Sequence, residues 1–257
     1  MVYSKIKVFG CDVCVIPTTR DNVKSDLLIR ERESDLTIGD SELPRLYILP
    51  SLSADAETVA VPRSEWGHTL SPTVQTAAAA VFMRCTRGLP MDEIEIKSGD
   101  EILIAFIDKK DRTISLKMPK CTLKYSNICQ KYANCEISSR VYSTKIGNVI
   151  VTKCENSSFF SRDAHLSFLY SVAHEYVASV SYSIEDDGIY LGAVGRESLR
   201  VCYPELCAAV VKDSLAYSSR RGESKIYIDE CIFSVVHQDG SFLICDTILD
   251  FPFIRSI

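Results

Sequence analysis

The sequence predicts an α/β (α+β) protein made of two copies of one unit, and two observations carry this prediction. An alanine-containing helix followed by three short strands occurs twice, at residues 74–118 and again at 204–245. Between these cassettes, β-branched runs alternate with turns rich in Gly, Asp and Asn. A duplicated unit predicts two lobes, and a cleft between lobes is a favoured ligand site.

The first half contains one predicted helix. Residues 74–87 (VQTAAAAVFMRCTR) are rich in alanine, follow Pro72-Thr73 and stop before Gly88, which are helix start and stop signals. Short strands rich in β-branched or alternating apolar residues are predicted around it, at 6–9, 13–16, 45–49, 93–96, 101–107 and 113–118. Residues 108–111 are expected to form a solvated turn.

The second half repeats this order. Residues 204–218 open with proline, carry Glu205 near the positive end of the helix and predict a second helix. Strands are expected to follow it, at 225–228, 232–236 and 242–245. Residues 161–180 have apolar side chains at helical spacing and predict a third helix, while 185–187 read as a turn closed by Gly188. The two lobes are expected to be 1–118 and 119–247.

Composition excludes several classes of protein. The chain has 257 residues, 46% of them hydrophobic and 25% charged, which is typical of a globular protein rather than a disordered one. A net charge of -5, without a basic run, argues against nucleic-acid binding, and no apolar stretch approaches the length of a membrane span. The odd number of cysteines, 11, and the lack of a signal peptide predict free thiols in the cytoplasm.

Five segments carry a resemblance that runs in order over most of the chain: YSKIKVFGCDVCVI, RLYILP, VPRSE, GNVIVT and GRESLRVCYPELCAAVV. They resemble diaminopimelate epimerase and its relatives. The resemblance implies two pseudo-repeated lobes, each a curved, mostly antiparallel sheet around a central helix, with residues 248–257 returning to the first lobe. It also implies a cofactor-independent isomerase that is often a homodimer, and in which two cysteines at helix starts exchange the α-proton of an amino acid.

Carried over residue by residue, the resemblance places the second-lobe catalytic cysteine at Cys202. The first-lobe cysteine falls on Thr73, with Thr69 and Ser71 as other occupants of that position. Substrate contacts fall on five further residues: Asn148, Cys11, Asp12, Gln75 and Tyr203. Pro204 and Glu205 replace residues that bind the substrate carboxylate in the family, so diaminopimelate is not the expected substrate.

Each of these positions also has a structural interpretation. Cys202 fits a thiolate base at a helix start and, equally well, a small buried thiol. Thr73 fits a proton donor, but a helix N-cap is the favoured interpretation. Cys11 and Cys14 have zinc-like spacing without a second ligand pair, and His165 and His174 would lie on opposite sides of a helix, so no metal or cofactor is expected.

Three functions remain open at this point. The leading one is an amino-acid epimerase or racemase in which Cys202 removes the α-proton. The second is a catalytically inactive epimerase-fold protein that binds a small amino-acid-like ligand or a partner. The third is a one-base lyase that dehydrates a small amino acid.

Overall fold

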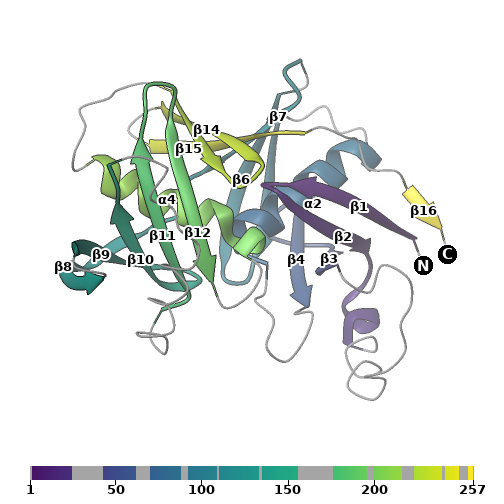
Figure 1. The fold of residues 1–257 in the computed structure, drawn as a ribbon. Coiled ribbons are helices and arrows are strands. Elements are labelled where there is room, and N and C mark those ends of the chain that lie inside the picture. The colour runs from purple at the N-terminus through teal and green to yellow at the C-terminus, as the bar shows by residue number, and fades with distance from the viewer. Residues whose placement is uncertain are drawn as a thin grey trace. The chain divides into compact units, whose positions relative to one another are not determined.

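The structure is a computed structural model (Figure 1). It describes residues 2–24, 43–61, 70–87, 92–108, 110–132, 135–155, 176–195, 199–215, 223–238, 241–248 and 254–256. The chain forms two compact units. Unit 1 contains Met1–Leu116 and Thr247–Ile257, and unit 2 contains Lys117–Asp246.

Unit 1 contains a sheet with the strand order β16-β1-β2-β3-β4-β5-β6-β7. The strands are β1 (Val2–Val8), β2 (Cys11–Pro17), β3 (Arg45–Leu49), β4 (Ala56–Val61), β5 (Glu93–Ser98), β6 (Glu101–Asp108), β7 (Thr113–Lys117) and β16 (Ile254–Ser256). Two neighbouring pairs, β2 with β3 and β4 with β5, are parallel, and the others are antiparallel. Helix α2 (Pro72–Arg87) joins β4 to β5, as a parallel connection requires.

Unit 2 contains a sheet with the strand order β8-β9-β10-β11-β12-β13-β14-β15. The strands are β8 (Thr122–Tyr132), β9 (Cys135–Thr144), β10 (Gly147–Lys153), β11 (Ala178–Ile184), β12 (Ile189–Gly195), β13 (Ser224–Ile228), β14 (Cys231–Gln238) and β15 (Ser241–Thr247). The short helix η2 (Leu199–Cys202) and helix α4 (Tyr203–Leu215) join β12 to β13.

The same sequence of pairings occurs in both units. In unit 2 the parallel pairs are β10 with β11 and β12 with β13, and the remaining pairs are antiparallel. Strands β9 to β15 therefore correspond one by one to β1 to β7, α4 corresponds to α2, and β8 corresponds to β16. The duplication predicted from the sequence is confirmed, and the fold is mixed α+β, mostly sheet with few helices.

Helix α2 forms the core of unit 1. Its alanines favour a helix and bring the strands close to its axis. Residues 77–83 are buried, and the helix packs against β1, β2, β5 and β6. Val13 and Val15 on β2 and Ile94 and Ile96 on β5 are fully buried. One face of the unit 1 sheet is thus covered by α2.

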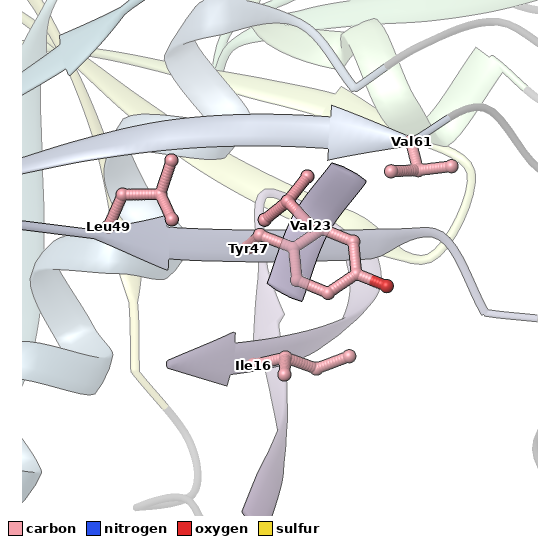
Figure 2. Packing of buried hydrophobic residues seen from close by; sticks show 5 residues of the cluster. All are labelled: Ile16, Val23, Tyr47, Leu49 and Val61. Atoms are coloured by element: carbon pink, nitrogen blue, oxygen red, sulfur yellow. The ribbon is translucent and has the colours of Figure 1, made fainter. Parts of the chain in front are cut away.

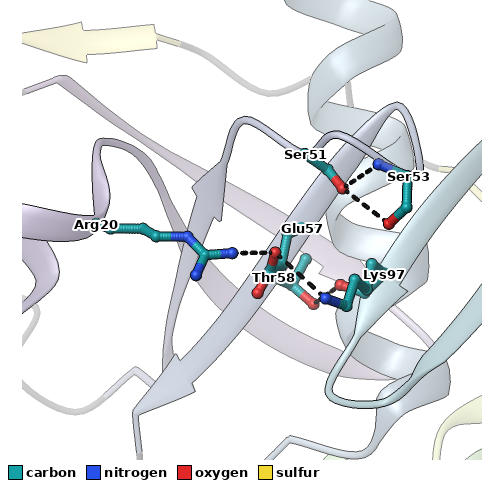
Figure 3. Close-up of polar contacts among 6 residues, drawn as sticks. All are labelled: Arg20, Ser51, Ser53, Glu57, Thr58 and Lys97. Atoms are coloured by element: carbon teal, nitrogen blue, oxygen red, sulfur yellow. Dashed lines mark hydrogen bonds and ion pairs between the residues drawn. The ribbon is translucent and has the colours of Figure 1, made fainter.

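A second apolar cluster covers the other face of β2, β3 and β4. Figure 2 shows its five buried residues, Ile16, Val23, Tyr47, Leu49 and Val61. Val23 belongs to a helical turn at 20–24, which the sequence analysis did not predict. From the same turn, Arg20 forms a 2.6 Å ion pair with Glu57 on β4, and Lys97 lies 3.7 Å from the same carboxylate (Figure 3). The turn is therefore held by both apolar and ionic contacts.

In unit 2, α4 packs against β9, β10 and β11 (Figure 1). Asp213, near the end of α4, is 2% exposed and fixes the helix to the sheet. Its carboxylate accepts hydrogen bonds from the Tyr142 and Tyr182 hydroxyls, both at 2.7 Å, and from Arg140 at 3.1 Å. Buried carboxylates need such partners to offset the loss of hydration.

Most of the predicted helices and strands are confirmed, and one predicted helix is wrong in part. The helices at 74–87 and 204–215 are confirmed, as are the first hairpin, the strand at 45–49 and both three-strand cassettes. The third helix is wrong over Ala178–Val180, which lie in β11 and pair with strands on both sides. Residues 161–175 and 216–218 of the predicted helices lie outside the described residues. No helix in the described part of the chain is long and apolar enough to cross a membrane.

Gly188 allows the turn between β11 and β12 to lie against β13. A Cβ atom there would come within 2.6 Å of the Lys225 carbonyl oxygen and 2.8 Å of the Tyr227 ring. Gly188→Ala should therefore lower the free energy of unfolding by about 2 kcal/mol, because backbone must move to relieve the clash. Urea denaturation would measure the change, and Asp186→Ala in the same exposed turn is the control. A change for Gly188→Ala as small as that of the control would contradict the expectation.

Candidate functional site

In unit 1, the start of β2 and the end of β4 lie at one end of the sheet. Register shows this, because Cys14 on β2 pairs with Arg45 on β3, and Arg45 pairs with Val61, the last residue of β4. The predicted residues Cys11 and Asp12 lie at this end. The first turn of α2, which carries Thr73 and Gln75, bonds through Gln75 to Thr58 on β4 and Ser98 on β5, which pair with each other.

The same relation holds in unit 2. Val149 near the start of β10 pairs with Ala178 on β11, and Ala178 pairs with Gly195, the last residue of β12. Helices η2 and α4 follow directly, so the predicted residues Asn148, Cys202 and Tyr203 share one end of unit 2.

Cys202 is the last residue of η2 and directly precedes α4. It is 2% exposed, and its thiol donates a hydrogen bond to the Leu199 carbonyl oxygen at 3.2 Å. The free N–H groups at the start of a helix stabilise a nearby negative charge. Cys202 therefore lies at a helix start with its thiol bonded to a backbone carbonyl oxygen.

Gly195 allows η2 to pack closely on the end of β12. A Cβ atom at this glycine would lie 2.4 Å from one methyl carbon of Leu199. Leu199 in turn supplies the carbonyl oxygen that accepts the Cys202 thiol hydrogen bond. The close approach of Gly195 therefore helps to set the position of Cys202.

Tyr203, the first residue of α4, is 2% exposed. Its hydroxyl donates a hydrogen bond to Asp229, in the turn between β13 and β14, and its ring lies 6.2 Å from the Phe233 ring. Burial and this hydrogen bond raise the pKa of the Tyr203 hydroxyl. The side chain expected to contact substrate thus also joins α4 to a neighbouring turn.

The first turn of α4 contains a wholly buried acidic residue, Glu205. Burial, followed by the nearby Glu205 carboxylate, raises the pKa of the Cys207 thiol. Cys207 therefore stays protonated, which distinguishes it from a reactive thiolate. Pro204 supplies no N–H group, so this helix start offers fewer donors to an anion than a glycine-rich one.

The start of α2 is capped by Ser71 rather than by Thr73. The Val74 N–H donates to the Ser71 hydroxyl oxygen at 3.3 Å, which is the N-cap hydrogen bond. The N-cap expected at Thr73 is therefore wrong by two residues, because Pro72 already has helical geometry and is the first helical residue. Thr73 is 4% exposed, and Thr69 lies outside the described residues.

Gln75 joins three segments at this helix start. Its amide nitrogen donates to the Leu70 carbonyl oxygen at 2.7 Å. Its amide oxygen accepts from the hydroxyls of Thr58 on β4 and Ser98 on β5, both at 3.1 Å. These bonds use both lone pairs of the Gln75 amide oxygen and one of the two N–H groups of the amide nitrogen. Its contacts fix the start of α2 to the sheet.

Cys11 and Asp12 lie on opposite faces of β2, because consecutive side chains in a strand alternate. Cys11 is buried on the face it shares with Val13, which is the face covered by α2. Asp12 is on the opposite face, where its carboxylate lies 3.8 Å from the Lys5 ammonium group. The structure thus brings Cys11, but not the Asp12 side chain, to the helix side of the sheet.

Asn148 is half-buried at the second position of β10. It follows Gly147, whose φ of +121° is a conformation that favours glycine. The Asn148 backbone oxygen accepts a hydrogen bond from the Val177 N–H at 2.9 Å. Its side chain is partly exposed, and its amide carries two N–H donors and an acceptor oxygen that can serve a ligand.

Other features of the described residues lie away from these positions. No three His, Cys, Asp or Glu side chains in the described ranges are close enough together to hold a metal ion. A cavity of about 360 Å³ lies at the far end of α4, lined in part by Ser214, Leu215, Asp187 and Glu223. None of the predicted site residues lines this cavity.

Asp229, which contacts the residue next to Cys202, was not among the predicted site residues. The turn between β5 and β6 contains Gly99 with a φ of +62°, and the matching turn between β13 and β14 contains Asp229 with a φ of +48°. Because Asp is common at such left-handed positions, the local sequence gives no specific signal for the role of its side chain.

Comparison with known proteins identifies the fold. The chain matches a hydroxyproline epimerase from Agrobacterium vitis with bound trans-4-hydroxy-L-proline, at 11% identity and a TM-score of 0.66, over 100% of this chain and 91% of that one. It matches a probable proline racemase from Agrobacterium radiobacter with bound carbonate, at 11% identity and a TM-score of 0.63, over 100% and 92% of the two chains.

A phenazine biosynthesis protein of the PhzF family from Bacillus anthracis also matches, at 11% identity and a TM-score of 0.62, over 100% of this chain and 98% of that chain. No protein-family model and no curated protein matches the sequence. The predicted fold is thus supported by proline racemase, hydroxyproline epimerase and PhzF-family structures, and not by diaminopimelate epimerase specifically. The chain has the two-lobed fold that racemases, epimerases and PhzF-family proteins share.

Proposed function

We propose that the protein is a cofactor-independent isomerase that inverts the α-carbon of a small amino acid. The observation that carries this proposal is the position of Cys202, a thiol directly before the helix that joins β12 to β13 in this fold. The likeness to a hydroxyproline epimerase and a probable proline racemase, over nearly the full length of each, supports the reaction class.

In the proposed reaction, Cys202 as thiolate removes the α-proton, and the electron pair is delocalised into the substrate carboxylate. A proton returned to the opposite face gives the other stereoisomer. Asn148, which is partly exposed, is the group proposed to orient the substrate. Thr73 at the start of α2 is the group proposed to return the proton.

Isotope exchange tests this function. The protein is incubated in deuterium oxide with single amino acids, including both stereoisomers of proline and trans-4-hydroxy-L-proline, and loss of the α-hydrogen signal is followed by NMR. Exchange with at least one of them is expected, together with the opposite stereoisomer. Cys202→Ser should slow the exchange by about a hundredfold or more, since general acid–base groups contribute that much.

Cys85→Ser is the matched control, because Cys85 is a half-buried thiol near the other end of α2 whose pKa burial raises. This variant should exchange at the wild-type rate. Absence of exchange with every amino acid offered, or exchange that persists in Cys202→Ser, would refute the proposed function.

A second candidate, a binding protein without catalysis, is favoured by the two helix starts. Pro204 and the buried Glu205 leave the start of α4 poorly suited to a substrate carboxylate. At the start of α2, the Gln75 side chain makes three hydrogen bonds within its own unit, which leaves at most one N–H group of its amide for a ligand. This function predicts a melting temperature raised by an amino-acid ligand, in the wild type and in Cys202→Ser alike, without any exchange.

A further inference from the structure

A side-chain pair connects the start of α4 to the turn between β13 and β14. Tyr203 directly follows Cys202, and its hydroxyl donates to the Asp229 carboxylate. The Tyr203 ring also rests against Phe233 on β14. Because Cys202 and Tyr203 are adjacent in the chain, a fixed Tyr203 also fixes the backbone at Cys202.

The turn has room for the Asp229 side chain. A two-residue hairpin turn with left-handed backbone favours Gly, Asn or Asp. The matching position in unit 1 is Gly99, and a Cβ atom built there meets no atom within 4 Å. In unit 2 this position is Asp229, with a φ of +48°, and its carboxylate accepts the hydrogen bond from Tyr203.

The groups around Tyr203 favour a hydrogen bond to Asp229 that persists at neutral pH. Burial, the hydrogen bond to Asp229 and the Asp229 charge all raise the pKa of the Tyr203 hydroxyl, so it remains a donor at neutral pH. Arg200 lies close to Tyr203. Its electrostatic interaction with Tyr203 and, to a smaller extent, with Asp229 raises the pKa of the Arg200 guanidinium group. The Tyr203 hydroxyl thus has a cation near it as well as the carboxylate that accepts its hydrogen bond.

We propose that Asp229 is a positioning residue that holds Cys202 in place through the hydroxyl of Tyr203. This inference deepens the proposed function, in which Cys202 is the reacting thiol. Loss of the pair frees the first turn of α4 and exposes Cys202, which is 2% exposed in the folded protein. The rest of α4 remains anchored by Asp213, near its other end.

Cysteine alkylation tests the proposal on the full chain without any substrate. Iodoacetamide labelling is followed by peptide mass spectrometry for the wild type, Tyr203→Phe, Asp229→Gly and Asp229→Asn. Cys202 should label about tenfold faster in Tyr203→Phe and Asp229→Gly, the factor expected when a hydrogen bond to a charged group no longer opposes local opening. Asparagine tolerates the turn and retains an acceptor oxygen, so Asp229→Asn should stay closer to the wild type.

Two internal controls separate positioning from unfolding. Cys207, fully buried in the same helix, should keep its wild-type labelling rate in all variants. Tyr227→Phe, on the same hairpin but stacked on Tyr190, should leave Cys202 unchanged. The double variant Tyr203→Phe with Asp229→Gly should label no faster than either single variant, because both remove the same bond.

Labelling of Cys202 within twofold of the wild type in either single variant would overturn the proposal. Parallel acceleration of Cys207, additive effects in the double variant, or equal rates for Asp229→Asn and Asp229→Gly would also overturn it. The isotope-exchange assay decides the proposed function separately. A protein without exchange but with accelerated Cys202 labelling would retain the positioning pair and lose the isomerase assignment.

Discussion

Asp213→Ala is expected to lower the free energy of unfolding by about 4 kcal/mol, the range found when one partner of a buried ionic network is removed. Three donors lose their acceptor at once, two tyrosine hydroxyls and the Arg140 guanidinium. Tyr142 and Tyr182 are themselves fully buried, so neither hydroxyl can turn to water. Urea denaturation followed by circular dichroism would measure the loss.

Smaller changes in the same network give a graded comparison. Tyr142→Phe and Tyr182→Phe each remove one hydrogen bond and should cost about 1 kcal/mol. Asp186→Ala, in the exposed turn between β11 and β12, should change stability by less than about 0.5 kcal/mol. Should Asp213→Ala cost no more than either tyrosine variant, the carboxylate would not be the centre of this network.

The network also has a pH dependence whose sign follows from Tyr142. Burial, the hydrogen bond to Asp213 and the Asp213 charge raise the pKa of the Tyr142 hydroxyl. The unfolded chain therefore releases this proton at a lower pH than the folded protein. The contribution to stability is complete below about pH 10, the usual pKa of tyrosine, and declines as the pH rises above it. Tyr142→Phe should show a shallower decline.

Gln75→Leu is expected to cost about 3 kcal/mol, roughly 1 kcal/mol for each of three hydrogen bonds. The substitution leaves the Leu70 carbonyl oxygen without its donor and the Ser98 hydroxyl without its acceptor. Thr58 retains a second bond to the Lys97 carbonyl at 3.3 Å, which limits the loss. Thermal and urea unfolding would quantify it.

Thr86→Ala is the control for this prediction. Thr86 lies near the other end of α2, and its hydroxyl bonds to the Phe82 carbonyl within the same helix at 2.8 Å. Its removal should cost less than about 1 kcal/mol, because it joins no separate segments. An equal loss for both variants would mean that Gln75 does not connect α2 to the sheet more strongly than an intrahelical bond does.

The sequence predicted the fold well where a local pattern determines the structure. Residues 77–80 are four alanines, and Gly99 and Asp108 mark turns, so α2 and both cassettes were found. The start of strand β11 was missed because helical spacing in the preceding residues was extended over it, although Ser179, Val180 and Ser181 alternate polar and apolar side chains as a strand does. Its pairing with β10 and β12 decides the structure there.

The candidate site was predictable only in part. The resemblance placed Cys202 directly before α4, since a helix start has a local signal in Pro204. It could not show that Asp12 points away from the helix side, or that Ser71 rather than Thr73 caps α2. Asp229 lies far from Cys202 along the chain, and only the fold brings its carboxylate to Tyr203.

The pairing of β16 with β1 makes unit 1 discontinuous along the chain. Val2 pairs with Ser256, so all of unit 2 lies between the two partners. Lys117–Asp246 of unit 2, by contrast, form one continuous stretch. Because long-range β pairing forms slowly, unit 1 is expected to complete its sheet later in folding than unit 2.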